Sequence, residues 1–73
     1  VKAYPNPTNG ILHLEYDFSS PHSLTLYDVL GRKVANWENE YQIDISDFEK
    51  GVYFLHIQNI ANQKFAVKKI TLE

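Results

Sequence analysis

Residues 51–59, Gly-Val-Tyr-Phe-Leu-His-Ile-Gln-Asn, decide the fold of this chain. Tyr53, Leu55 and Ile57 alternate along one face of an extended strand, and the opposite face, which includes Phe54, is also mostly apolar. A strand that is apolar on both faces is typical of the centre of a packed sheet. We therefore expect residues 51–59 to form a central strand.

The same two-residue period recurs on both sides of this strand, for example at Leu12 and Leu14. Turn residues separate the runs, notably Asn9-Gly10 and Leu30-Gly31-Arg32, where Gly31 should adopt a positive φ. No segment is long enough for a crossover helix, which argues against an α/β fold. The pattern predicts an antiparallel sandwich or small barrel. Its seven expected strands are 1–5, 10–17, 23–29, 32–37, 40–45, 51–59 and 63–72.

Two local irregularities are also predicted. Residues 46–49, Ser-Asp-Phe-Glu, fit a capping box, so we expect one helical turn there, closed by Gly51. In the last strand, Phe65 and Val67 share one phase, whereas Ile70 and Leu72 share the other. We therefore expect a bulge or a change of facing partner at 68–69, Lys-Lys.

The composition narrows the function. The 73 residues allow one domain, and their 44% hydrophobic content suffices for a thin core but not for a deep substrate pocket as well. With no cysteine, the chain has neither disulfides nor thiolate metal sites. The net charge of −2 argues against a broad nucleic-acid-binding face. No apolar run approaches the roughly 20 residues that span a membrane.

The beginning of the chain suggests a piece of a longer protein. Val1-Lys2-Ala3 opens without a methionine, and no signal-peptide pattern follows. We therefore expect a cargo domain to precede this chain, and any export signal to lie elsewhere.

Catalytic and zinc sites are not indicated. His13, His22 and His56 lack the spacing of zinc ligands, and the first and last of these should lie at exposed or rim positions. No nucleophile elbow of the Gly-x-Ser-x-Gly type is present. We therefore expect no enzyme activity and no cofactor.

Calcium stays open as an alternative. Asp44, Asp47 and Glu49 supply carboxylates, but they lack the Asp/Asn series with a central glycine that an EF-type loop requires. Capping of the short turn accounts for Glu49 without a metal.

Two surface groups allow a binding role. Trp37, Tyr27 and Tyr41 could form an aromatic platform for sugars, although in so small a domain such rings usually fill the core. Lysines 64, 68 and 69 gather near the end of an otherwise acidic chain. They could shield an edge strand from unwanted pairing, present positive charge to a receptor, or do both.

Four motifs, in order, resemble one protein family. Residues 4–10, Tyr-Pro-Asn-Pro-Thr-Asn-Gly, resemble the opening motif of the type A sorting domain of the type IX (Por) secretion system. Residues 26–34 resemble its central hairpin with a Tyr-Asp-x-x-Gly core, and residues 45–54 resemble its segment ending in Gly-x-Tyr. Residues 64–72 resemble its lysine-rich closing strand, so the resemblance covers essentially the whole chain.

The resemblance implies a seven-stranded antiparallel Ig-like β-sandwich that acts as a C-terminal secretion signal in Bacteroidetes-type bacteria. Cargo would reach the periplasm first and then cross the outer membrane to the cell surface or the medium. Implied partners are the outer-membrane translocon, shuttle and sortase-like components of the system, with the cargo domain N-terminal to residues 1–73. A sortase-like peptidase would typically remove the domain by cutting near or before Val1.

The same resemblance carries functional roles onto particular residues. These are Pro5, Asn6, Pro7 and Gly10 of the first motif, Gly51 and Tyr53 of the third, and Lys64, Val67, Lys68, Lys69 and Ile70 of the last. Glu73 departs from the family, in which many members end on a basic or apolar residue. Two rival hypotheses remain: a carbohydrate-binding or adhesive Ig-like module, which requires coplanar exposed aromatics, and a passive spacer, which requires sequence beyond Glu73.

Overall fold

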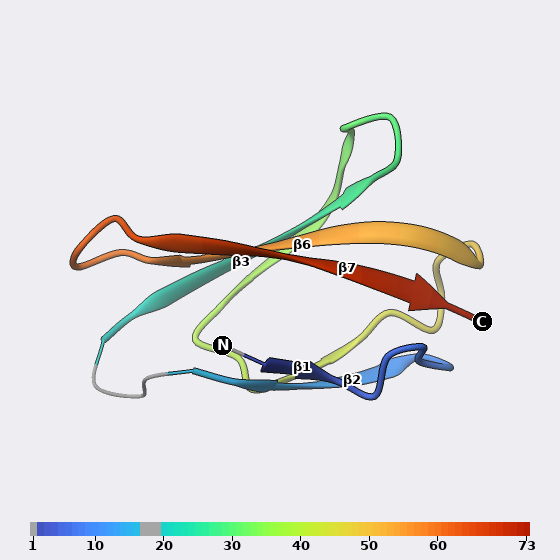
Figure 1. Ribbon diagram of the computed structural model, residues 1–73, viewed down its shortest axis with the longest axis horizontal. Helices are drawn as coiled ribbons and strands as arrows, with labels where there is room; N and C mark the ends of the chain where they lie inside the picture. The colour runs from blue at the N-terminus through green and yellow to red at the C-terminus, as the bar shows by residue number, and fades with distance from the viewer. Residues whose placement is uncertain (1, 17–19) are drawn as a thin grey trace.

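The computed structural model describes residues 2–16 and 20–73, which form seven strands and no helix (Figure 1). The strands make two antiparallel sheets, with orders β1-β2-β5 and β4-β3-β6-β7. Their bounds are β1 Lys2–Tyr4, β2 Ile11–Glu15, β3 His22–Asp28, β4 Lys33–Glu38, β5 Gln42–Asp44, β6 Gly51–Asn59 and β7 Phe65–Leu72.

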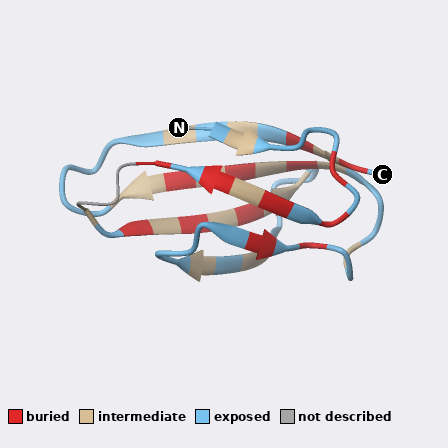
Figure 2. Cartoon of the chain, turned by 90° about the horizontal axis from the view of Figure 1, so that it is seen from below, coloured by how far each residue is buried: buried red, intermediate tan, exposed pale blue. Residues whose placement is uncertain are grey.

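The sheets face each other across one apolar core. Along β3 and β6, buried residues alternate with partly exposed ones, as the banding in Figure 2 shows. Each sheet contributes its inward-facing residues, because a pleated strand sends alternate side chains to opposite faces. The buried apolar residues are Leu12, Leu14, Tyr16, Leu24, Leu26, Ile43, Ile45, Tyr53, Leu55, Ile57, Ile70 and Leu72.

This architecture confirms the all-β prediction and is consistent with an Ig-like sandwich. Each observed strand overlaps one of the seven expected ranges. Strand β6 is central, since it pairs with β3 on one side and with β7 on the other. Val1, Asp17 and Ser19, which belonged to predicted strands or turns, lie outside the described residues.

The helical turn predicted at 46–49 is wrong. Residues 46–50 form a non-helical turn, closed by a 3.1 Å hydrogen bond from the Phe48 amide to the Ile45 carbonyl. The side chain that caps this turn is that of Asp44 and not the expected Ser46 or Glu49. Its carboxylate accepts a 2.9 Å hydrogen bond from the Ser46 amide. An Asx-type bond of this kind offers the backbone a turn instead of a helix start.

The bulge predicted at Lys68 and Lys69 is also wrong. Strand β7 pairs with β6 in unbroken register from Phe65 to Leu72. The change of phase arises because Phe65 and Val67 lie on the outer face, where they stay exposed. An irregularity occurs instead between β3 and β4, where the register shifts between Leu26 and Tyr27.

Among the described residues, no helix has the length and apolar character needed to cross a membrane.

Candidate recognition surface

The opening motif, residues 4–10, leaves the three-stranded sheet and reaches the edge of β7 in the other sheet (Figure 1). Asn6 makes the first connection. Its side-chain amide donates a 2.7 Å hydrogen bond to the Lys69 carbonyl and accepts a 3.1 Å bond from the Thr71 amide. A carboxamide has the donor and acceptor arrangement of a peptide group. Asn6 therefore pairs with β7 as a backbone peptide of a neighbouring strand would.

Thr8 extends this pairing from Thr71 to Glu73. Its amide donates a 2.9 Å bond to the Thr71 carbonyl, and its own carbonyl accepts a 2.8 Å bond from the Glu73 amide. These bonds form a parallel bridge between Thr8 and Leu72. Four backbone groups of residues 69–73 are thus hydrogen-bonded by the motif. We call this stretch the covered edge of β7.

The motif is held in place by its own turn. The buried Thr8 hydroxyl donates to the Ile11 carbonyl at 2.8 Å and accepts a 3.1 Å bond from the Gly10 amide. Gly10 has φ +149°, and a Cβ there would lie 2.6 Å from the Ser46 Cβ. Its carbonyl accepts a 2.8 Å bond from the Ile45 amide. Only glycine meets both requirements, the positive φ and the close approach.

Gly51 and Tyr53 fix the adjoining turn, residues 46–50. Tyr53 is buried, its hydroxyl donates to the Glu49 carbonyl, and its ring lies 6.4 Å from that of Phe48. Burial, together with the negative charge of Glu49 and of Asp28, raises the pKa of the Tyr53 hydroxyl, which therefore stays protonated as a donor. Gly51 has φ +149° and begins β6 opposite Leu72.

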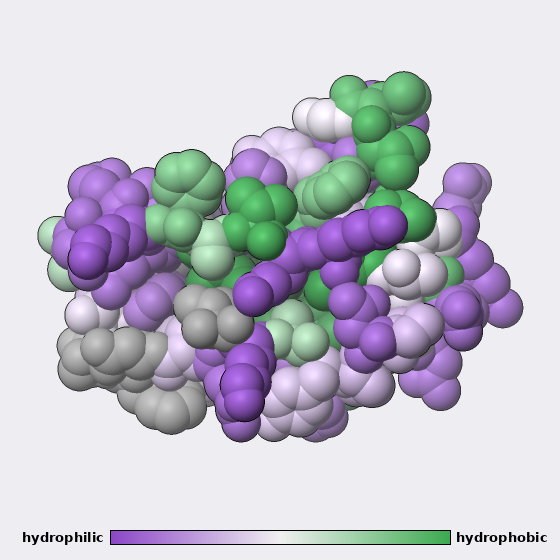
Figure 3. Space-filling view, viewed as in Figure 1, coloured by the Kyte–Doolittle hydropathy of each residue, from purple (hydrophilic) through white to green (hydrophobic). Residues whose placement is uncertain are grey.

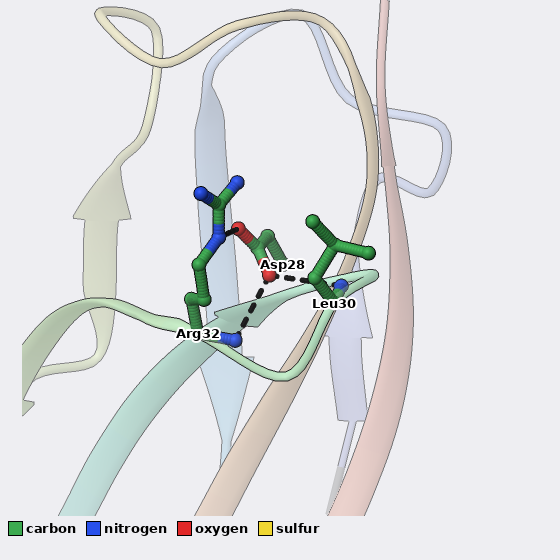
Figure 4. Close-up of polar contacts among 3 residues, drawn as sticks. All are labelled: Asp28, Leu30 and Arg32. Atoms are coloured by element: carbon green, nitrogen blue, oxygen red, sulfur yellow. Dashed lines mark hydrogen bonds and ion pairs between the residues drawn. The ribbon is translucent and has the colours of Figure 1, made fainter.

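The hairpin between β3 and β4 forms a second exposed feature. The Asp28 carboxylate accepts 2.9 Å bonds from the Leu30 and Arg32 amides and a 2.8 Å bond from Arg32 Nε (Figure 4). The backbone bond from Arg32 is the main cause of the lowered Asp28 pKa. Gly31 has φ +80°, as the sequence predicted. The tip exposes Val29 and Leu30, and it makes the apolar projection at the upper right of Figure 3.

The predicted recognition residues fall into two groups. One group gathers at one end of the sandwich, because the motif bonds the 69–73 edge and Gly51 and Tyr53 pair with Leu72 and Ile70. It comprises Pro5, Asn6, Pro7, Gly10, Gly51, Tyr53 and Ile70. Lys69 belongs to this group through its carbonyl. The other group, Lys64, Val67 and Lys68, lies along the first half of β7 or just before it, and the motif makes no hydrogen bond to it among the described residues.

Burial separates these residues further. Ile70 is fully buried and Gly10 and Tyr53 are nearly so, so they shape the surface from beneath. Pro5, Asn6, Pro7 and Lys69 are exposed and belong to the surface itself. Both prolines follow cis peptide bonds.

Sequence reasoning missed Thr8 and Thr71 as members of this site. Thr8 is buried, at 2% exposure, and it makes both backbone and hydroxyl bonds. A small hydroxyl residue within a turn is a known local hydrogen-bonding signal. Thr71 contributes only backbone groups to the site, so nothing in its side chain could have revealed it.

The structure also bears on the alternatives. In the described part of the chain, no three His, Asp or Glu side chains gather into a group that could hold a metal ion. The Asp44 carboxylate instead accepts bonds from Ser46, which lower its pKa.

The three candidate platform aromatics do not form one surface. Tyr27 lies 4.6 Å from His56 with the rings inclined by 60°, Trp37 packs against the core, and Tyr41 stacks on Tyr16. Binding to a flat sugar face requires coplanar exposed rings, and these three residues do not provide them.

Comparison with known proteins supports the resemblance seen in the sequence. A family model described as "Secretion system C-terminal sorting domain" matches residues 2–73, which include the opening motif, the hairpin and β7. No match to the chain is found among the curated proteins.

Proposed function

The chain belongs to the secretion system C-terminal sorting domain family, and from this premise we propose how its surface serves as the signal. Domains of this family are C-terminal secretion signals for type IX secretion. A sorting domain is not itself catalytic, and it implies interaction with the secretion system and export across the outer membrane. The family match does not favour a carbohydrate-binding module.

In this proposal, the secretion machinery recognises the folded end of the sandwich where the opening motif meets the covered edge. The observation that carries it is the pairing of Asn6 and Thr8 with residues 69–73. This pairing makes one surface from two segments that are far apart in the sequence. Asn6 lies 63 positions from Lys69 and 65 positions from Thr71. A surface of this kind exists only when the domain is folded. A secretion-system protein that binds it therefore recognises the folded domain and not the unfolded chain.

The recognition residues divide between contact and support. Pro5, Asn6, Pro7 and Lys69 offer exposed groups for contact, whereas Gly10, Tyr53 and Ile70 hold those groups in place. A charged side chain at the edge of an interface contributes mainly to specificity and the rate of encounter. Lys69 therefore suits a first contact with an acidic surface of the machinery.

The finer steps of export complete the proposal. The domain forms one unit at the C-terminal end of a cargo protein, which passes through the periplasm. The outer-membrane translocon and shuttle components bind the domain, and a sortase-like peptidase removes it from the cargo. The domain contributes binding alone to these steps, and the cutting chemistry belongs to the peptidase.

A secretion assay tests the proposal. The chain is fused behind a signal peptide and a fluorescent reporter, in a host with a working type IX system and in a matched strain lacking it. We expect reporter at the surface or in the medium only in the competent strain. Reporter that stays periplasmic in both strains would contradict the proposal.

A matched charge reversal tests the contact role of Lys69. Lys69→Glu should lower export several-fold, because it reverses an exposed charge within the recognition surface. Lys33→Glu makes the same change on β4, at an exposed position of the opposite edge strand, and should leave export unchanged. Equal export of both variants would show that Lys69 is not part of the contact surface.

A further inference from the structure

The two sheets present four edge strands, and three of them are poor templates for another strand. Strands β1 and β5 have only three residues each, and β4 is interrupted by the register shift beside Leu26. Short and irregular edges of this kind discourage pairing with other chains. Strand β7 differs, because it has eight residues in unbroken register with β6.

Only the second half of the β7 edge is covered. Backbone groups along a strand point alternately to its two neighbours. Residues 69, 71 and 73 bond the motif, and the Lys64 carbonyl accepts a bond from the Asn59 amide on the β6 side. By this alternation, the peptide groups of Phe65 and Val67 face away from β6. We call this stretch, residues 65–67, the open edge.

The open edge has the chemistry of a docking strand. In the described part of the chain, no hydrogen bond reaches the outward backbone groups of Phe65 or Val67. Their side chains are 67% and 45% exposed, and apolar surface covers the first half of β7 in Figure 3. The Phe65 ring lies parallel to that of His56 at 6.5 Å, beside a groove of about 330 Å³. Outward peptides without a partner and exposed apolar side chains therefore coincide at Phe65 and Val67.

The lysines around the open edge decide what can occupy it. If a second copy paired antiparallel about Ala66, Lys64 of one copy would lie opposite Lys68 of the other. Like charges directly opposite in a ladder are destabilising, and edge lysines guard against self-association. The one ion pair in the described part of the chain joins Asp28 and Arg32, so the charges of these lysines are not matched by any carboxylate there. The open edge therefore disfavours pairing with a second copy of the chain and favours pairing with a strand that carries acidic side chains.

We propose that the open edge of β7 receives an extended acidic segment of a secretion-system protein by strand addition. Peptide groups of that segment pair with Phe65 and Val67, its apolar side chains lie beside theirs, and its carboxylates meet Lys64 and Lys68. Main-chain pairing supplies affinity in this mode of recognition, and side chains supply specificity. The inference rests on the proposed function and names the mode of contact.

A proline substitution tests the backbone contact. Val67→Pro removes the outward amide while leaving the ladder to β6 intact, since proline is tolerated at a sheet edge. We expect reporter export to fall about tenfold, as for the loss of one or two hydrogen bonds. Val67→Thr, a β-branched residue of similar size that keeps the amide, is the matched control and should lose much less export than Val67→Pro. The unfolding midpoints of both should stay within about 5 °C of the wild type.

The outcomes separate the two proposals. Wild-type export that does not depend on the type IX system contradicts the proposed function. Normal wild-type export together with normal export of Val67→Pro overturns strand addition alone. If Val67→Pro unfolds, Phe65→Pro carries the same test, because it places proline at the first residue of the strand.

A charge pair tests the acidic partner. Lys64→Glu should lower export several-fold, whereas Lys64→Arg, which keeps the charge, should retain much more export than Lys64→Glu. Equal export of the Glu and Arg variants would overturn the acidic character of the partner segment.

Discussion

The two halves of β7 belong to one regular strand but have opposite surroundings. Residues 69–73 are closed by hydrogen bonds from a motif at the other end of the sequence, whereas the outward peptides of residues 65–67 have none within the described chain. The first half exposes apolar side chains, and the second buries Ile70 and Leu72. One edge strand can therefore combine structural closure and docking, because hydrogen-bonding sites along an edge are used residue by residue.

The largest expected difference between the halves lies in stability. Ile70→Ala should lower the free energy of unfolding by about 2–5 kcal/mol, because it empties a fully buried site. Val67→Ala, on the exposed face three residues earlier, should change it by less than about 0.5 kcal/mol. Urea denaturation of both variants measures the contrast. Similar losses at both sites would mean that the two halves are equally packed.

The next largest effect concerns the turn that brings the motif to the covered edge. Gly10→Ala meets a positive φ and a Cβ contact of 2.6 Å, so it should destabilise the domain by about 2–4 kcal/mol. Gly51→Ala is a matched control, because Gly51 has the same φ of +149° with no atom within 4 Å of an added Cβ. It should cost only about 1–2 kcal/mol. Equal costs would show that the close approach to Ser46 does not constrain the motif.

A smaller effect on stability isolates the hydrogen bonds between Asn6 and the covered edge of β7. Asn6→Ala removes both side-chain hydrogen bonds to β7 and should lower the free energy of unfolding by about 1–2 kcal/mol. Asn9→Ala changes the other asparagine of the motif, whose side chain makes no hydrogen bond in the described part of the chain. That variant should stay within about 0.5 kcal/mol of the wild type. If Asn6→Ala and Asn9→Ala have the same free energy of unfolding, the hydrogen bonds from Asn6 do not stabilise β7.

Much of this fold follows from local pattern. The alternation at Tyr53, Leu55 and Ile57 located the central strand, and the turn chemistry at Gly10 and Gly31 located two reversals. Such signals depend on neighbouring residues alone, so a single sequence displays them. The resemblance in four motifs added the family, which the family model confirms.

Two predictions were wrong at local features of the chain, and the assembly of the site was missed because its contacts are non-local. The phase change after Val67 suggested a bulge, but the first half of β7 simply turns its apolar residues outward. At residues 46–49, an Asp44 hydrogen bond replaced the expected helical cap. The pairing of Asn6 with Lys69 and Thr71 spans nearly the whole chain and uses backbone groups, which carry no sequence signature. The sequence therefore named several residues that the fold brings to this end of the sandwich, but it did not show that they lie together, and it left out Thr8 and Thr71.

Amide hydrogen exchange of the intact chain, followed by NMR, tests the division of β7 most directly. We expect slow exchange at Thr71 and Glu73, whose amides donate hydrogen bonds to the motif, and fast exchange at Val67, whose amide faces the open edge. Lys68, whose amide faces β6, is the internal control and should exchange slowly. Asn6→Ala should speed exchange at Thr71 and leave Val67 unchanged. Slow exchange at Val67, equal to that at Thr71, would mean that the Val67 amide is protected and that the first half of the β7 edge is not open.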